Sequence, residues 1–237
     1  MSAQDSPLAD ADGASAQSAP PRRPRRLRWG LALAAGVLGG VLIGVLGRSH
    51  HATAPSASGI APAPPVETWA AGEKLAPDFA LHDETGQPVS LAAFRGRPVL
   101  LAFMDPLCGD FCPLEAKIID SALARLPASE RPAVVALSVN PWGNAPSILR
   151  KDVRDWRLTP AWHWAVGATP ALRRAWADYQ VAVADSPTTK NGVTTHEITH
   201  DEDTFVIDRK GYQRAIYIYP FRAAVLAREI RAVAATR

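Results

Sequence analysis

Two continuous apolar runs bracket an amphipathic stretch in the middle of the chain. The first run covers residues 98–103 (PVLLAF), and the second covers residues 132–139 (PAVVALSV). An uninterrupted apolar run of this length is typical of a strand that is buried on both faces of a sheet. Between the runs, residues 112–126 place apolar side chains at helical spacing. This order predicts a strand, a helix and a second strand parallel to the first, and therefore an α/β fold.

The residues after this unit predict a hairpin and a closing helix. Residues 205–207 and 215–219 are apolar and flank the turn Asp208-Arg-Lys-Gly211, where glycine allows a tight reversal. Residues 222–235 again carry apolar side chains at helical spacing. A strand–helix–strand unit followed by a helix, a hairpin and a helix is the order of the thioredoxin-like fold. We assign this α/β fold to residues 75–237.

The positive charge of the chain is concentrated near its N-terminus. The formal net charge is +3, and residues 1–48 contain six Arg against three Asp, which accounts for the whole excess. The rest of the chain holds 20 basic and 20 acidic side chains. A neutral domain without a basic stripe gives no reason to expect nucleic-acid binding.

Residues 29–47 predict one transmembrane helix, because they carry no charge and can cross a hydrocarbon core of about 30 Å. The arginines before them predict that the basic N-terminus, residues 1–28, is cytoplasmic and that the domain lies on the extracytoplasmic (periplasmic or outer) face of the cell membrane. A cleaved signal peptide is the alternative, although its apolar region usually has only about 7–15 residues. Residues 48–74 are rich in Ala, Pro and Ser and are interpreted as a linker, in which His50 and His51 are solvated spacers rather than metal ligands.

The only two cysteines, Cys108 and Cys112, follow the first predicted strand in the run 103–113 (FMDPLCGDFCP). A C-x3-C pair between a strand and a helix can form a disulfide or bind a soft metal ion. A purely structural disulfide is the weaker interpretation, because closing so short a loop gains little chain entropy. Pro113 is expected at the first helical position. Cys112 would then lie at the helix N-terminus, where backbone amides stabilise a thiolate.

His200 is the candidate third ligand, in the segment 199–211 (THDEDTFVIDRKG) that leads into the predicted hairpin. Thioredoxin-like proteins usually carry a cis-proline opposite the cysteines here, and Glu202 stands at about that place in this chain. Two thiolates and one imidazole form a soft, low-coordinate set that suits Cu(I) and can also take Cu(II). Zinc is possible, but structural zinc sites normally have four protein ligands. The acidic run 201–203 orients the imidazole or steers a cation, or else it forms a solvated turn.

These residues resemble the SCO/SenC family, membrane-anchored copper proteins that help to assemble the copper A centre of cytochrome c oxidase. The usual signature of that family is T-x-C-P-D-x-C-P with a distant D-H-S, placed eight residues before the Asp of a D-x-x-G turn. His200 lies eight residues before Asp208, and the resemblance covers residues 75–221. Further matching segments are Ala76-Pro-Asp-Phe79, Gly86, Leu91, Phe94-Arg-Gly96 and Leu137-Ser-Val-Asn-Pro141.

The chain departs from the family pattern next to the candidate ligands. Gly109 stands in place of the Pro after the first cysteine, and Asn140 stands in place of an Asp. Met104-Asp-Pro106 replaces the usual aromatic and Thr lead-in, and Thr199 and Asp201 flank the histidine where the family favours Asp and Ser. All three candidate ligands are retained.

The resemblance implies a metallochaperone in which Cys108, Cys112 and His200 bind copper and pass it to the oxidase subunit that carries the copper A site. It also implies an extracytoplasmic copper donor and a thiol reductant, because a disulfide cannot ligate copper. The alternative is a membrane-tethered thiol–disulfide oxidoreductase that uses the cysteine pair on client cysteines, with His200 only tuning the thiolate. The first function is not enzymatic and the second is. A peroxidase is a weaker interpretation, because the P-x-x-x-T/S-x-x-C context of that class is absent.

The remaining histidines and tryptophans have simpler interpretations. His196 is expected to be solvated in a polar loop, residues 190–197, with a role in helping copper to enter the site as the alternative. His82 and His163 are expected in strands with structural roles. Clustered tryptophans are interpreted as core rather than as a docking patch: Trp156, Trp162, Trp164 and Trp176.

Overall fold

The computed structural model describes residues 64–236. The predicted cytoplasmic segment 1–28, the predicted transmembrane segment 29–47 and the linker histidines lie outside the described residues. Within residues 64–236, no helix has the length and apolar character needed to cross a membrane.

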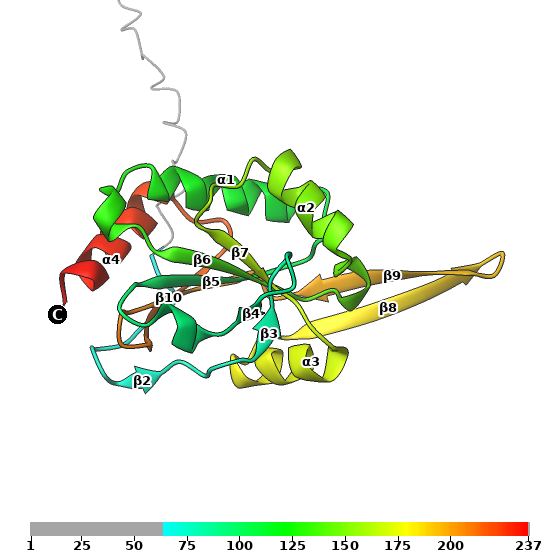
Figure 1. Cartoon of the computed structure of the whole chain (residues 1–237), viewed down its shortest axis with the longest axis horizontal. Coiled ribbons are helices and arrows are strands. Elements are labelled where there is room, and N and C mark those ends of the chain that lie inside the picture. The colour runs from blue at the N-terminus through cyan, green and yellow to red at the C-terminus, as the bar shows by residue number, and fades with distance from the viewer. Residues whose placement is uncertain (1–63, 237) are drawn as a thin grey trace, which may run out of the picture. The chain divides into compact units, whose positions relative to one another are not determined.

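A seven-stranded sheet forms the centre of the domain (Figure 1). Its order is β1–β11–β10–β5–β6–β7, and β2 also pairs with β11. β5 pairs with β6, and β6 with β7, in parallel, whereas β10 is antiparallel to both β5 and β11. The predicted parallel pair and the predicted hairpin are therefore confirmed. The strands are β1 (Glu67–Thr68), β2 (Lys74–Leu75), β5 (Val99–Met104), β6 (Ala133–Ser138), β7 (Trp162–Ala165), β10 (Asp203–Ile207) and β11 (Tyr212–Ile218).

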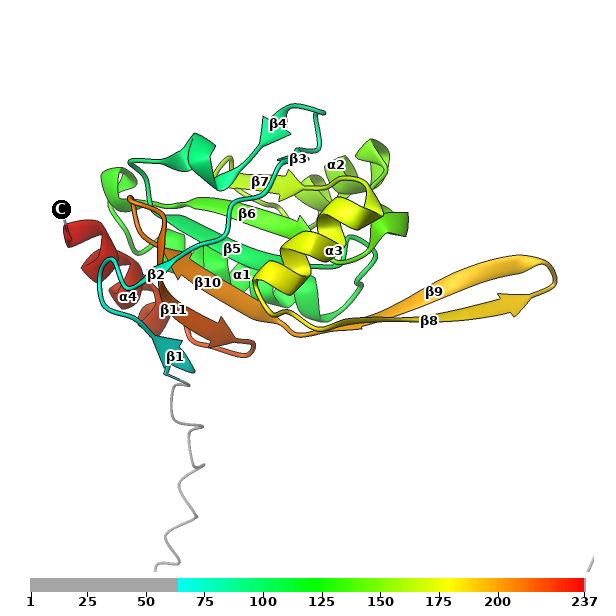
Figure 2. The ribbon, with the colours of Figure 1, turned by 90° about the horizontal axis from the view of Figure 1, so that it is seen from below.

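Helices cover both faces of this sheet, as the views in Figure 1 and Figure 2 show. On one face lie α1 (Phe111–Leu123), α2 (Pro146–Asp155) and α4 (Ala223–Ala235), and on the other lies α3 (Thr169–Asp178). Two short strands, β3 (Leu81–His82) and β4 (Pro88–Val89), form a separate pair. The remaining helical turns are η1 (Leu91–Phe94), η2 (Ala128–Glu130) and η3 (Pro141–Gly143).

The core explains why the first apolar run has no polar alternation. All six residues of β5 are buried. Leu100 and Met104 pack among the residues of α1 and α4, whereas Leu101 and Phe103 pack among those of α3. Successive side chains of a strand point to opposite faces, and here both faces are covered. The interpretation of four tryptophans as core is confirmed, since all of them are buried: Trp156, Trp162, Trp164 and Trp176.

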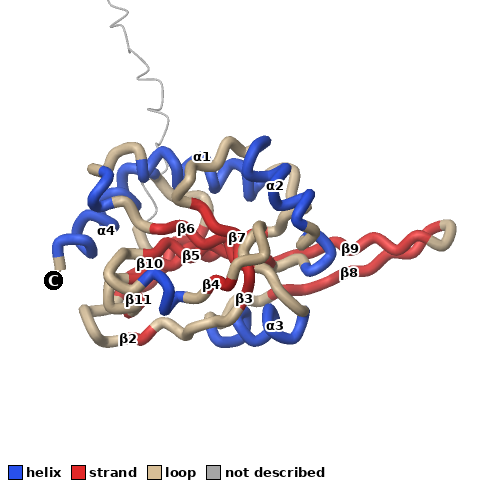
Figure 3. The backbone as a smooth tube through the Cα atoms, in the orientation of Figure 1, coloured by secondary structure: helices blue, strands red, loops and turns tan. Residues whose placement is uncertain are grey.

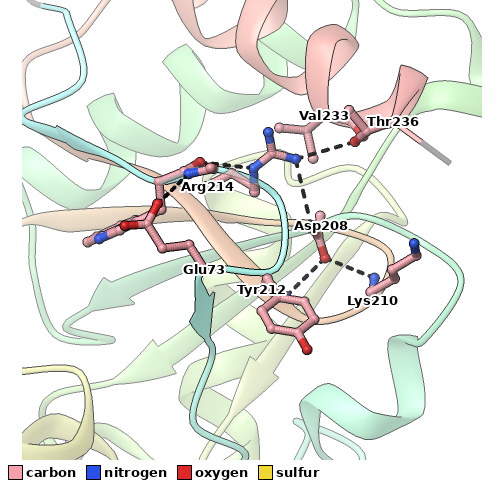
Figure 4. Close-up of polar contacts among 9 residues, drawn as sticks. Glu73, Asp208, Lys210, Tyr212, Arg214, Val233 and Thr236 are labelled. Atoms are coloured by element: carbon pink, nitrogen blue, oxygen red, sulfur yellow. Dashed lines mark hydrogen bonds and ion pairs between the residues drawn. The ribbon is translucent and has the colours of Figure 1, made fainter.

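The turn between β10 and β11 is held by one aspartate (Figure 4). Oδ1 of Asp208 accepts hydrogen bonds from the backbone amides of Lys210 and Tyr212, each at 2.9 Å. Nη1 of Arg214 lies 3.8 Å from Asp208 Oδ2. Gly211 has a φ of 85°, and a Cβ atom there would meet the guanidinium of Arg95. Glycine therefore serves the tight turn as predicted, and the close approach of an arginine adds a second reason for it.

A second hairpin contradicts the prediction of a polar loop over residues 190–197. β8 (Val183–Lys190) and β9 (Val193–His200) form a two-stranded sheet, which extends away from the central sheet in both ribbon views and in the tube of Figure 3. Asn191 and Gly192 connect the strands with φ values of 52° and 77°. Both values suit the two-residue turn that favours Asn-Gly. The strands escaped prediction because they are mostly exposed and show no apolar alternation.

The central sheet also recruits residues that the sequence assigned to the linker. β1 and β2 lie at residues 67–75, and both pair with β11. Two-residue strands of Glu-Thr and Lys-Leu carry no apolar pattern, so only the pairing partner identifies them.

Candidate functional site

The two cysteines lie where β5 leads into α1. α1 begins at Phe111, whose backbone amide donates to the N-cap carboxylate of Asp110 at 2.8 Å. The helix therefore starts two residues before Pro113, which was expected at its first position. The Asp110 side chain is a better N-cap than the residue before proline, and it determines the start. Cys112 is 2% exposed, Cys108 is partly exposed, and both thiols are free.

The structure places the stabilised thiolate on the first cysteine rather than on the second. The backbone amide of Cys112 donates to the sulfur of Cys108 over 3.3 Å. Hydrogen bonding from the Cys112 thiol, aided by this amide, lowers the pKa of Cys108 to about 7. The same thiol–thiol hydrogen bond, together with burial, raises the pKa of Cys112. The expectation that helix amides would ionise Cys112 is thus wrong, because these amides act on the sulfur in the preceding loop.

A buried carboxyl group lies one turn into α1. Glu115 is 2% exposed and accepts a hydrogen bond from Oγ1 of Thr204 at 2.6 Å. Burial raises the pKa of Glu115 to about 8, so this carboxyl is largely protonated near neutral pH. Sequence reasoning missed it, although Glu115 shares a helical face with the inward-facing Ile119 and Ala122.

His200 is the last residue of β9 and lines the same groove as Cys108. The groove has a volume of about 570 Å³. One wall comes from the segment around Cys108, residues 105–111, which we call the cysteine loop. The other residues that line it are 195–200, Asn140 and Glu202. Nδ1 of His200 lies 2.9 Å from the carbonyl oxygen of Asp201. A carbonyl can only accept, so Nδ1 carries a proton, and in the neutral ring Nε2 keeps the lone pair that a metal ligand requires.

The three predicted ligands are neighbours without yet forming a metal site. Cys108 and His200 line one groove, and Cys112 lies behind Cys108 in the core. Among residues 64–236, no group of three His, Cys, Asp or Glu side chains is close enough together to hold a metal ion. Coordination by all three residues therefore requires movement of the β9 end, of the cysteine loop, or of both.

The acidic run beside His200 has structural roles. Asp201 supplies the carbonyl that holds the imidazole, and its carboxylate accepts from the amide of Ala182 at 2.8 Å. Burial raises the pKa of Glu202 and raises that of Asp203 to about 6. The run thus orients the imidazole through its backbone and is more than a solvated turn. Four carboxylates line the groove: Asp105, Asp110, Glu197 and Glu202.

His196 is wedged between two partners and not solvated in a loop. Its ring stacks on Trp142 with the centroids 3.6 Å apart and the planes 14° from parallel. Its Nδ1 lies 3.0 Å from Oδ2 of Asp185 on the neighbouring strand. Sequence reasoning missed both partners. The available signal was that Trp142 follows β6 at the same carboxyl edge of the parallel strands where Cys108 follows β5. His82 and His163 lie in β3 and β7, as expected.

The chain is thus an α/β domain with a partly exposed cysteine just before its first long helix and a buried cysteine in the first turn of that helix. Comparison with protein families gives a match to SCO1/SenC over residues 68–235. The match covers most of the chain, and the chain therefore belongs to the SCO1/SenC family, as its motifs predicted. Comparison with curated proteins gave no match.

Solved structures support the same conclusion about the fold. Yeast Sco1 with copper bound is 18% identical with a TM-score of 0.61, and the match covers 69% of this chain and 90% of that one. Apo Sco1 from Thermus thermophilus is 26% identical with a TM-score of 0.57, covering 67% of this chain and 91% of that one. BsSco, a member of the Sco family of cytochrome c oxidase assembly proteins in which a disulfide switch was identified, is 17% identical with a TM-score of 0.56 and coverage of 74% and 99%. The predicted thioredoxin-like fold is confirmed.

Proposed function

We propose that this chain is a copper metallochaperone that binds Cu(I), and Cu(II) in a second state, through Cys108, Cys112 and His200. The observation that carries this proposal is the shared groove of Cys108 and His200, with the amide of Cys112 on the sulfur of Cys108. Solved relatives that contain copper support the choice of metal. Copper is the cargo, and its destination is the copper A site of cytochrome c oxidase.

Loading couples metal binding to proton release. Cys108 is about half ionised near neutral pH, whereas Cys112 must lose its proton to the solvent or to a neighbouring base when copper arrives. In the neutral ring of His200, the Nε2 lone pair can bind copper while Nδ1 keeps its hydrogen bond to the carbonyl of Asp201. The ordered steps are capture by Cys108, approach of His200 and ionisation of Cys112.

The setting follows from the proposed topology. Residues 29–47 would anchor the domain on the extracytoplasmic face, within reach of the membrane-bound oxidase subunit. The partners are that subunit, an extracytoplasmic copper donor, and a thiol reductant that keeps both sulfurs able to bind copper.

The test is the Cu(I) stoichiometry and affinity of the reduced full-length chain. We expect one copper per chain, and we expect His200→Ala to weaken binding at least about a hundredfold, because loss of a ligand exceeds the loss of an outer hydrogen bond. His82→Ala is the matched control, since His82 is exposed on β3 and does not line the groove. Weak binding that ignores His200 would exclude the three-ligand site.

A second function is favoured by the asymmetry of the cysteine pair. A partly exposed thiol with a pKa of about 7 in front of a buried thiol suits attack on a client disulfide. Cys108 would form a mixed disulfide, and Cys112 would then displace the client, which leaves with both its sulfurs reduced while this chain is oxidised. The reductant named above would restore the pair. Reduction of a model disulfide should then survive His200→Ala and be abolished by Cys108→Ser.

A further inference from the structure

One edge of β9 is not paired with another strand, and the pairing with β8 determines which backbone groups of β9 point out from that edge. Lys190 and Val193 flank the two-residue turn, so they form the hydrogen-bonded pair that closes the hairpin. Hydrogen-bonded and non-hydrogen-bonded pairs alternate along an antiparallel ladder. The backbone N–H and C=O groups of Thr194, His196 and Ile198 therefore point away from β8. Across the described part of the chain, no hydrogen bond joins these outward groups to another element.

The two outer edges of this hairpin differ in one decisive residue. Pro187 sits at the middle of β8, opposite His196, in a pair whose backbone groups point outward. Proline has no N–H, so the outer edge of β8 cannot complete a ladder with another strand. Edges protected in this way are a common means of avoiding unwanted pairing. β9 contains no proline and no lysine or arginine, so its edge keeps every donor and acceptor.

The groove that holds Cys108 and His200 runs along this free edge. It is lined by all six consecutive residues 195–200. Successive side chains of a strand point to opposite faces, so a groove that touches all six follows the edge of the strand rather than one face. The opposite wall carries the cysteine loop, with Leu107 and Phe111 each 51% exposed. The groove thus offers backbone hydrogen bonds on one side and apolar contacts on the other.

We propose that an extended, basic segment of a client polypeptide docks in this groove as a third strand on the free edge of β9. Main-chain hydrogen bonds to Thr194, His196 and Ile198 would supply affinity, and Leu107 and Phe111 would receive side chains of the segment. Four carboxylates and no Lys or Arg line the groove, which selects a segment carrying positive charge. This inference identifies how the client meets the proposed function and rests on that function only for the client's role.

Strand addition explains why the hairpin carries the histidine. A segment paired with β9 would pass the sulfur of Cys108, because the same groove contains both. Its backbone phase would determine which of its side chains face that sulfur and His200. The stacking of His196 on Trp142, which lies outside the hairpin, helps to hold β9 in position for such a segment.

The test exploits the phase of a β-ladder. The probe is the peptide Lys-Val-Thr-Ala-Val-Thr-Val-Lys, blocked at both ends and free of thiols, titrated into the reduced full-length chain without copper. Two further versions carry N-methyl groups at alternate positions, in one phase or in the other. Only every second N–H group of the bound peptide points toward β9. The version methylated at these positions should bind at least about tenfold more weakly, and the other version should bind like the parent. Replacing both Lys residues by Glu should also weaken binding.

A matched pair of variants tests the edge in the protein itself. Thr194 and Thr189 face each other across the hairpin, and their hydroxyls are 2.9 Å apart. Thr194→Pro removes an outward N–H from β9, whereas Thr189→Pro removes one from β8. Both variants lose the hydrogen bond between the two hydroxyls. In both, the new proline occupies a position whose backbone groups point outward, as those of Pro187 do. We expect Thr194→Pro to weaken the peptide about tenfold and Thr189→Pro to leave it unchanged.

The outcomes separate this proposal from the copper proposal. No peptide binding up to about millimolar, equal effects of both N-methyl phases, or equal effects of the two proline variants would overturn strand docking. So would self-association of the chain through β9 that the peptide does not disrupt, since the occupant would then be a second copy. If the phase effect appears while Cu(I) binding ignores His200, the docking edge stands and the copper function fails.

Discussion

The cysteine loop and the β8–β9 hairpin support the candidate site in opposite ways. Cys108 and Cys112 follow a fully buried strand and open a helix that packs in the core. His200 ends a hairpin whose strands are mostly exposed and pair only with each other. An isolated two-stranded hairpin is marginally stable, so its position depends on a few contacts with the domain. The sulfur of Cys112 is therefore held in the core, while the imidazole is carried on an exposed hairpin.

This difference would suit the proposed copper chaperone, which must take up and release its cargo. A rigid three-ligand cage would bind copper tightly and release it slowly, whereas a mobile third ligand allows exchange with a partner. The stacking of His196 on Trp142 ties the hairpin to the domain near the groove, and Val183 and Ile198 also pack against the core. The following predictions test this contrast.

The largest effect is expected in the core beneath the cysteines. Ile119→Ala, at a fully buried position of α1, should lower the free energy of unfolding by about 2–5 kcal/mol through the cavity it leaves. Val193→Ala, at a position 64% exposed near the tip of the hairpin, should change it by less than about 0.5 kcal/mol. Denaturant unfolding of both variants measures the difference. Equal losses would contradict the contrast.

Glu115→Gln should stabilise the protein at neutral pH. The folded-state pKa of Glu115 is about 8, above the ordinary value of 4.5, so unfolding releases a proton between these values. Stability from this group is complete below pH 4.5 and declines as pH rises toward 8. Glutamine keeps an acceptor for Thr204 without a charge, and should add a few kcal/mol near pH 8. The free energy of unfolding should therefore depend less steeply on pH in the variant between pH 4.5 and 8. An unchanged pH dependence would count against a protonated Glu115.

Trp142→Ala should loosen the hairpin while leaving the core intact. The stacked contact with His196 is worth about 0.5–1.5 kcal/mol, which corresponds to about twofold to tenfold faster hydrogen exchange in β8 and β9. Phe111→Ala is the control, because the ring contact of Phe111 is with Tyr219, which lies outside the hairpin. Unchanged exchange in the hairpin would show that other contacts hold it.

The smallest effect concerns the ionisation of Cys108. Alkylation by iodoacetamide should reach half its maximal rate near pH 7, with Cys112 unreactive in the folded chain. Asp110→Asn should lower this midpoint by less than about one unit, because the carboxylate hydrogen-bonded to Cys108 raises its pKa. Asp155→Asn, on α2 and far along the chain, should leave the midpoint unchanged. A midpoint near 9 in the unmodified chain would exclude the stabilised thiolate.

Local patterns were enough to predict much of this fold. The apolar runs at β5 and β6, the helix between them, the β10–β11 turn and α4 all follow from side chains close together in the sequence. The β8–β9 hairpin and the short strands β1 and β2 were missed, because their side chains are mainly polar and their stability comes from pairing. Only the Asn-Gly pair at residues 191–192 signalled the turn.

The sequence by itself determined the chemistry available: two thiols where a loop meets a helix, one imidazole eight residues before a turn, and the SCO1/SenC motifs that connect them. Tertiary structure alone decided that Glu115 is buried against Thr204 and that His196 stacks on Trp142. It also decided that a free strand edge borders the groove. Burial, stacking and ladder phase depend on groups brought together from distant parts of the chain, so no local pattern contains them.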